Sequence, residues 1–94
     1  MDNTEEIQKY IKGSPVFVFG FSHCPYCHKA KELFKKLNVK YGYLDIDTLE
    51  KSQQLPFETV LEKMNNQDTY PQVFVNATFI GGFDSNYYRL YNYY

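Results

Sequence analysis

Residues 16–27 read VFVFGFSHCPYC, an apolar run that leads into a pair of cysteines. The run Val16–Phe19 is apolar on both faces, which is typical of a central, parallel strand that is covered on both sides. Pro25 then stands where the first turn of a helix tolerates proline. From Cys27 onward, apolar side chains recur at helical spacing. The pattern predicts a buried strand, a loop, and a helix that begins beside Cys24.

Further elements extend outward from this stretch. Before it, residues 2–4 can cap a short helix that ends at Gly13. After it, a strand is expected at residues 41–46. Residues 48–66 have a helical pattern, which we expect to be divided in two because Pro56 fits a fresh helix start.

The end of the chain completes the predicted fold. Residues 72–75 and 78–80 form an expected hairpin, and Asp84 or Ser85 caps a last helix. The order is α-β-α-β-α-β-β-α, which predicts one α/β domain over residues 1–94. Its expected architecture is a mixed four-stranded sheet with helices on both faces and an extra short N-terminal helix.

Length, composition and charge restrict the class of protein. The chain has 94 residues, a formal net charge of −1, and 44% hydrophobic and 19% aromatic residues. Its eight Phe and ten Tyr residues offer a short chain large areas to bury. A near-neutral domain does not favour nucleic acid, and no apolar run reaches the length of a membrane span. We expect a cytoplasmic monomer with no nucleic-acid and no membrane partner.

The cysteine pair is placed where thiol–disulfide chemistry is favoured. A helix N-terminus leaves backbone N–H groups unpaired and carries a partial positive charge. This charge stabilises a thiolate at Cys24 and lowers the pKa of that thiol. Cys27 lies one turn further into the helix, within reach of Cys24 but less accessible. The pair therefore predicts an exposed attacking thiolate and a neighbouring thiol that resolves the mixed disulfide.

Two other chemistries also use paired cysteines. Tetrahedral zinc needs four ligands, and the other strong candidates, His23 and His28, directly flank the pair, which crowds the ligands awkwardly. The string from Cys24 to His28 also matches c-type haem attachment, with Met64 as an axial candidate. Haem attachment normally occurs outside the cytosol, and an apolar strand and a hairpin are not typical of a helical cytochrome. Both alternatives rank below redox catalysis.

A second motif indicates the family. Residues 69–75 read TYPQVFV and residues 80–85 read IGGFDS. Together with Cys24-Pro25-Tyr26-Cys27, they resemble glutaredoxins over roughly residues 14–91. The spacing is similar to that of the small dithiol forms of bacteria and phages. The resemblance implies a thioredoxin-like fold in which a cis peptide bond precedes Pro71.

The resemblance also implies the residues of the site. Cys24 and Cys27 would be the catalytic pair. The main chain of Tyr70 would pair with the cysteine part of glutathione as an added strand does, and Gly82 would let the chain pass close to the ligand. The residues implied to bind glutathione are Tyr26, Thr69, Tyr70, Pro71, Gly82, Phe83, Asp84 and Ser85.

Some positions depart from the family pattern. Many members carry Lys or Arg three residues before the first cysteine, where this chain has Phe21. The helix terminus, with His23 or Lys29, would then stabilise the thiolate and meet the glycyl carboxylate of glutathione. Tyr70 replaces the usual Val before the proline, and the side chain of Gln72 is expected to face solvent.

The implied activity is glutathione-dependent thiol–disulfide oxidoreduction. The chain would reduce protein disulfides and glutathione mixed disulfides through Cys24 and Cys27, with glutathione as co-substrate and no metal. Ribonucleotide reductase is one electron acceptor that the resemblance suggests. One alternative is a [2Fe–2S] cluster bridged by two glutathiones and held through Cys24, although Pro25 favours redox work. Another is a thioredoxin-like protein that a reductase reduces.

Overall fold

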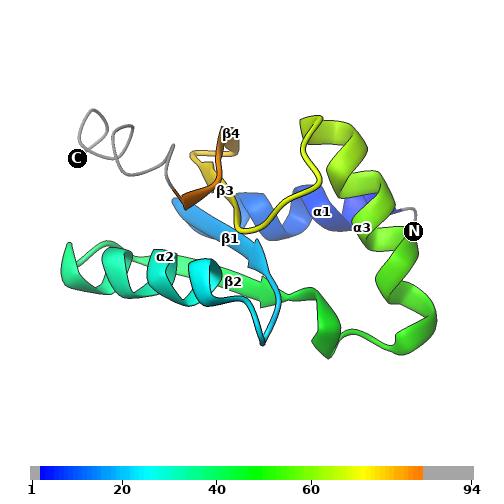
Figure 1. The fold of residues 1–94 in the computed structure, drawn as a ribbon. Coiled ribbons are helices and arrows are strands. Elements are labelled where there is room, and N and C mark those ends of the chain that lie inside the picture. Colours follow the sequence, from blue (N-terminus) through cyan, green and yellow to red (C-terminus); the bar gives the residue numbers. More distant parts are fainter. Residues whose placement is uncertain (1–2, 84–94) are drawn as a thin grey trace.

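The computed structural model describes residues 3–83, and Figure 1 shows how their helices and strands are arranged. The elements in chain order are α1 (Asn3–Lys12), β1 (Val16–Gly20), α2 (Pro25–Lys36), β2 (Tyr41–Asp45), the short 3-10 helix η1 (Ile46–Thr48), α3 (Lys51–Asn65), β3 (Gln72–Val75) and β4 (Thr78–Gly81). This order confirms the predicted succession as far as the hairpin. The expected last helix, with Asp84 and Ser85, lies outside the described residues.

The four strands form one mixed sheet in the order β2-β1-β3-β4. β1 runs parallel to β2 and antiparallel to β3, and β3 runs antiparallel to β4. The register places Gly20 opposite Asp45 and Phe19 opposite Gln72. The predicted central position of β1 is confirmed, although β1 is parallel to its neighbour on one side only.

Helices cover both faces of the sheet, as the apolar character of β1 predicts. Figure 1 shows α1 and α3 on one side and α2 on the other. The first face packs a mainly aromatic cluster of Ile7, Ile11, Phe17, Phe19, Ile46, Phe57, Leu61 and Phe74. The second face packs a mainly aliphatic cluster of Val16, Val18, Ala30, Phe34, Val73, Val75 and Ile80. Alternate residues of β1 therefore supply both halves of the core.

The predicted division at Pro56 is wrong, because α3 is a single helix that contains this proline. A proline inside a helix removes one backbone hydrogen bond and costs about 3 kcal/mol or more. Phe57 and Leu61 are fully buried on the same helix, and burying each such side chain contributes about 1.5–3 kcal/mol. Gln54 Nε2 also donates to the carbonyl oxygens of Asp47 (3.2 Å) and Leu49 (2.9 Å). The burial of Phe57 and Leu61 and the hydrogen bonds of Gln54 together outweigh the backbone hydrogen bond that Pro56 removes.

The hairpin turns on Asn76 and Ala77, as predicted. Both residues have positive φ angles, 49° and 65°, the combination that matches the twist of a two-residue hairpin loop. Asn76 N also donates to Pro15 O at 2.7 Å, which fastens the turn to the start of β1. No helix in the part of the chain described, residues 3–83, is long and apolar enough to span a membrane.

Candidate active site

Cys24 is the N-cap of α2, at the end of the loop that leaves β1. Its backbone is extended (φ −97°, ψ 108°), and Pro25 occupies the first helical position. Its Sγ accepts a hydrogen bond from Cys27 N at 3.1 Å. The sulfur therefore lies at the positive end of α2, where backbone N–H groups stabilise negative charge.

Cys27 lies behind Cys24 and is fully buried, whereas Cys24 is half-buried. The two cysteines are joined as a disulfide, with their Cα atoms 5.2 Å apart. Gly20 makes room for the buried sulfur, since a β-carbon at that position would lie 2.7 Å from Cys27 Sγ. The last residue of β1 thus has to be small for the cysteine pair to sit where it does.

The loop before Cys24 is held by a hydrogen bond to Asp47 of η1. Ser22 N donates to Asp47 Oδ1 at 2.9 Å, and His28 Nε2 lies 2.7 Å from Ser22 O. Hydrogen bonds from the Ser22 side chain and backbone hold the pKa of Asp47 below its ordinary value. His23 is exposed. These contacts hold the loop in one shape immediately before Cys24.

The loop before β3 approaches Cys24 from the other side. The peptide bond between Tyr70 and Pro71 is cis, as expected. Cys24 Sγ lies 3.9 Å from Tyr70 O, and Pro71 is buried. Two segments that are 46 residues apart in the sequence therefore meet at the sulfur.

Phe21 and Tyr70 pack edge to face, with ring centroids 4.8 Å apart. The Tyr70 hydroxyl donates to Glu62 Oε2 at 3.0 Å. Burial and the neighbouring Glu62 carboxylate raise the pKa of Tyr70. Phe21, at the position where a basic residue is common in the family that the sequence resembles, thus supplies a ring that supports the segment beside Cys24.

A groove of about 440 Å³ opens beside Tyr70, whose carbonyl oxygen contacts Cys24 Sγ, and beside Tyr26, which lies between the two cysteines in the sequence. The residues that line it are Tyr26, Gln67, Thr69, Tyr70, Pro71, Gly82 and Phe83. Six of these were predicted from the sequence as a glutathione-binding set, and the structure brings them together. The other two predicted residues, Asp84 and Ser85, lie outside the described part of the chain. The rings of Tyr26 and Phe83, which both line the groove, pack with their centroids 6.1 Å apart.

Gln67 and Gln72 show what sequence reasoning missed. The prediction that Gln72 faces solvent is wrong, because its side chain is fully buried. Its Nε2 donates to Gln67 O at 2.7 Å and Thr69 O at 3.3 Å, and its Oε1 accepts from Asn65 Nδ2 at 2.7 Å. A buried amide needs such partners, and here they hold the lining of the groove. The available signal was that Gln72 opens an otherwise wholly apolar strand.

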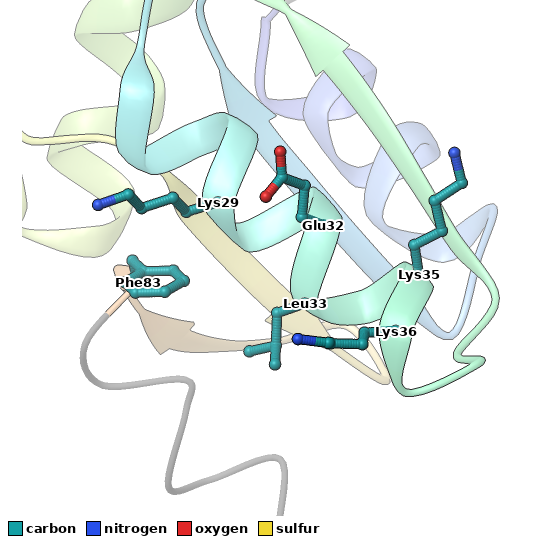
Figure 2. A pocket seen from close by; sticks show the side chains of 6 residues that line it. All are labelled: Lys29, Glu32, Leu33, Lys35, Lys36 and Phe83. Carbon is teal, nitrogen blue, oxygen red and sulfur yellow. The ribbon is translucent and has the colours of Figure 1, made fainter.

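A second hollow, of about 510 Å³, lies along α2 (Figure 2). It is lined by Lys29, Glu32, Leu33, Lys35 and Lys36 of α2 and by Phe83, which follows β4. It shares Phe83 with the groove described above. Lys29 Nζ also lies 5.1 Å from the centroid of the Tyr26 ring, so Lys29 brings a positive charge to the rim of the groove.

The metal alternatives gain no support from the geometry. Cys24 and Cys27 are bonded to each other, and His28 is engaged with Ser22 O. Within residues 3–83, no three or more His, Cys, Asp or Glu side chains are grouped as a metal site would require. The arrangement favours dithiol chemistry over a cluster held through Cys24.

Comparison with known proteins identifies the family. The family model described as Glutaredoxin matches residues 16–80, which include β1, the cysteine pair and the hairpin. The chain belongs to the glutaredoxin family. Among curated glutaredoxins, "Glutaredoxin-2, mitochondrial" of Bos taurus is 43% identical over 77 residues, which are 82% of this chain and 48% of that protein. "Glutaredoxin-1" of Rhizophagus irregularis is 36% identical over 80 residues, 85% of this chain and 77% of that protein.

The chain spans about half the length of the mitochondrial glutaredoxins that it matches. These relatives come from mammals and a fungus, so the expected likeness to bacterial and phage glutaredoxins stays a prediction.

Solved structures confirm the thioredoxin-like fold. The buckwheat glutaredoxin–glutathione complex superposes with a TM-score of 0.85 at 28% identity, covering 96% of this chain and 80% of that one. Wheat glutaredoxin superposes with a TM-score of 0.86, also at 28% identity, covering 96% and 82% of the two chains.

Proposed function

We propose that this chain is a glutathione-dependent thiol–disulfide oxidoreductase. The observation that carries the proposal is the unequal placement of the two sulfurs. Cys24 lies half-buried at the N-terminus of α2, with its sulfur 3.9 Å from the carbonyl oxygen of the groove residue Tyr70, while Cys27 is fully buried one turn further into the helix. A thiolate attacks a disulfide, and a second thiol within reach releases the product.

In the first step, the Cys24 thiolate attacks one sulfur of the substrate disulfide. A bond forms between Cys24 Sγ and that sulfur, the substrate S–S bond breaks, and the other sulfur leaves as a thiolate. The N–H of Cys27, which bonds Cys24 Sγ at 3.1 Å, and the positive end of α2 stabilise the attacking charge.

In the second step on a protein disulfide, the Cys27 thiolate attacks Cys24 Sγ. The Cys24–Cys27 disulfide forms, and the protein thiolate leaves with both electrons. Two glutathione thiols then restore the dithiol and leave as glutathione disulfide. On a glutathione mixed disulfide, a glutathione thiolate can attack the Cys24 adduct directly, so Cys27 is not required.

The groove beside Cys24 is the proposed seat of glutathione. The Tyr70 main chain would pair with the cysteine part of the ligand. Its γ-glutamyl carboxylate would meet N–H groups at residues 83–85, where Asp84 would accept from the γ-glutamyl ammonium. Phe21 carries no charge that could pair with the glycyl carboxylate of glutathione. We assign that pairing to Lys29, whose Nζ lies over the Tyr26 ring. The buckwheat glutaredoxin described in complex with glutathione supports this choice of ligand.

The partners and the place of action belong to the same proposal. Disulfide-containing or glutathionylated proteins are the substrate class, and ribonucleotide reductase is one candidate. A monomer in a reducing compartment such as the cytoplasm suits a dithiol that must be re-reduced after each turnover. The names of the mammalian relatives refer to mitochondria, so fractionation of tagged protein is needed to locate this chain.

Paired serine variants test the activity. We expect Cys24→Ser to abolish reduction of a glutathionylated peptide, because it removes the attacking sulfur. Cys27→Ser should retain that reaction and lose reduction of a peptide with an internal disulfide. Glutathione disulfide formation, followed with each peptide, measures both effects. Full activity of Cys24→Ser would exclude the proposed reaction, and equal loss in both assays for Cys27→Ser would exclude the division of roles.

A further inference from the structure

An ion pair lies beside the resolving cysteine and has no part in the steps above. Lys31 Nζ is 3.2 Å from Asp45 Oδ1 and 3.5 Å from Asp45 Oδ2. The side chains of Lys31 and Asp45 are only 14% and 15% exposed. Lys31 Nζ also lies 4.0 Å from the centroid of the Tyr43 ring. These contacts restrain the ammonium on two sides and hold the carboxylate in one place.

Gly20 has both this carboxylate and Cys27 as neighbours. Gly20 and Asp45 are partners in the β1–β2 ladder. A β-carbon on Gly20 would lie 2.7 Å from Cys27 Sγ and 3.8 Å from Asp45 Oδ1. The sulfur and the carboxylate oxygen therefore border the same small space, which the glycine leaves open. Lys31 follows Cys27 by one turn on the same face of α2.

The other titratable groups of this region are engaged elsewhere. On α2, Cys24 is bonded to Cys27 and His28 contacts Ser22 O. On η1, the Asp47 carboxylate accepts from Ser22 N. On β2, the Tyr43 ring lies under Lys31. Asp45 Oδ1 is the carboxylate oxygen among the atoms nearest to the space over Gly20 that the buried sulfur also borders.

Cys27 has to lose a proton before it attacks, because the thiolate is the nucleophile. A carboxylate within hydrogen-bond reach, or one water away, can accept such a proton. We propose that Asp45 accepts the Cys27 proton in the resolving step, while Lys31 holds the carboxylate in position. This inference rests on the proposed function, in which Cys27 is the resolving cysteine.

The resolving step transfers one proton and one electron pair. The proton moves from Cys27 Sγ to Asp45, the Cys27 thiolate attacks Cys24 Sγ, and the Cys24–substrate bond breaks. The substrate leaves as a thiolate with the electron pair of that bond. When glutathione reduces the Cys24–Cys27 disulfide, Cys27 departs as a thiolate and takes the proton back from Asp45.

The two thiols can be followed separately with dithiobis(nitrobenzoate), an aromatic disulfide that yields a coloured thiolate. Attack by Cys24 on the reagent releases the first thiolate, and attack by Cys27 on the mixed disulfide releases the second. For Asp45→Asn at neutral pH, we expect the rate ratio of second to first release to fall about 100-fold. The ratio should recover as alkaline solvent deprotonates Cys27. Stopped-flow absorbance over a pH series measures both rates.

Controls separate proton transfer from packing. Asp45→Glu keeps the carboxylate and should restore much of the ratio, whereas the exposed Glu50→Gln should leave it at the wild-type value. A wild-type ratio in Asp45→Asn would overturn the proposal, as would a low ratio that does not recover at alkaline pH. A Cys27→Ser variant that still releases both thiolates would instead overturn the resolving role of Cys27.

Discussion

Gly20 controls whether a sulfur fits under the end of β1. Its Cα faces Cys27, and the nearest atoms to an added β-carbon would be Cys27 Sγ at 2.7 Å and Cys27 Cβ at 3.0 Å. Both atoms belong to a fully buried side chain on α2. An added methyl group could be accommodated only by moving α2 or the end of β1, since interiors are close-packed.

We expect Gly20→Ala to lower the free energy of unfolding by about 1–3 kcal/mol, the usual cost of overpacking. Urea denaturation measures this change. Gly13→Ala is the matched control, because the nearest contact of its β-carbon is Tyr10 O at 3.3 Å. Gly13→Ala should change the free energy by less than about 1 kcal/mol. Equal effects of the two substitutions would contradict the role assigned to Gly20.

Single residues also show how far the sequence predicts the site. Cys24, Tyr26 and Pro71 were predictable because each belongs to a short motif whose geometry is local or shared by the family. The burial of Gln72 was not predictable, because its three hydrogen bonds go to Asn65, Gln67 and Thr69. Such bonds exist only once α3 and the loop after it have packed on β3.

At the scale of elements, η1 supports the loop that leads to Cys24. Asp47 is the contact, through Ser22 N at 2.9 Å. The pKa of Asp47 is lowered in the folded protein, mainly by its hydrogen bonds with Ser22. A lowered carboxyl pKa contributes stability above the unfolded pKa, and this contribution is lost as the pH falls through the folded pKa.

The stability advantage of wild type over Asp47→Asn should therefore depend on acidity. We expect wild type to be the more stable protein above the ordinary pKa of 3.8, with the difference shrinking as the pH falls below that value. Urea midpoints of both proteins over an acidic pH series measure the difference. Glu50→Gln, on the exposed residue before α3, is the control. Parallel curves for wild type and Asp47→Asn would show that the charge at residue 47 adds nothing.

The elements themselves follow closely from the pattern of apolar residues, and α3 shows where this reasoning ends. The strands, the hairpin and the start of α2 are specified by short-range features such as the Val16–Phe19 run and Pro25. Pro56 predicts a break by the same local logic. The helix continues because Phe57 and Leu61 pack against α1 and the sheet, and a local pattern does not contain that contact.

For the whole molecule, the aromatic cluster on one face of the sheet forms one of the two halves of the core. The Phe19 ring is fully buried, and its centroid lies 4.9 Å from that of Phe17, 5.7 Å from Phe57 and 5.9 Å from Phe74. The Tyr10 ring centroid lies 6.1 Å from that of Phe19, so rings from α1, β1, α3 and β3 surround Phe19. Side chains from four elements pack around one ring in a small domain, whose core is limited by its size.

We expect Phe19→Ala to lower the free energy of unfolding by about 3–5 kcal/mol, through lost burial and the cavity left behind. This is a large share of the about 5–15 kcal/mol that stabilises an ordinary domain. Leu55→Ala is the control, because Leu55 is 70% exposed on α3. Urea or thermal unfolding compares the two, and a loss below about 1 kcal/mol for Phe19→Ala would contradict this view of the core.

The contact between Phe21 and Tyr70 bears on how the protein responds to dissolved ions. A basic side chain at residue 21 would act on the sulfur through a field that salt screens within about 10 Å at 0.1 M ionic strength. Two packed rings 4.8 Å apart offer salt no charge to screen. The support that residue 21 gives to the segment beside Cys24 is therefore not weakened by ionic screening, whereas the effect of a basic side chain there would be.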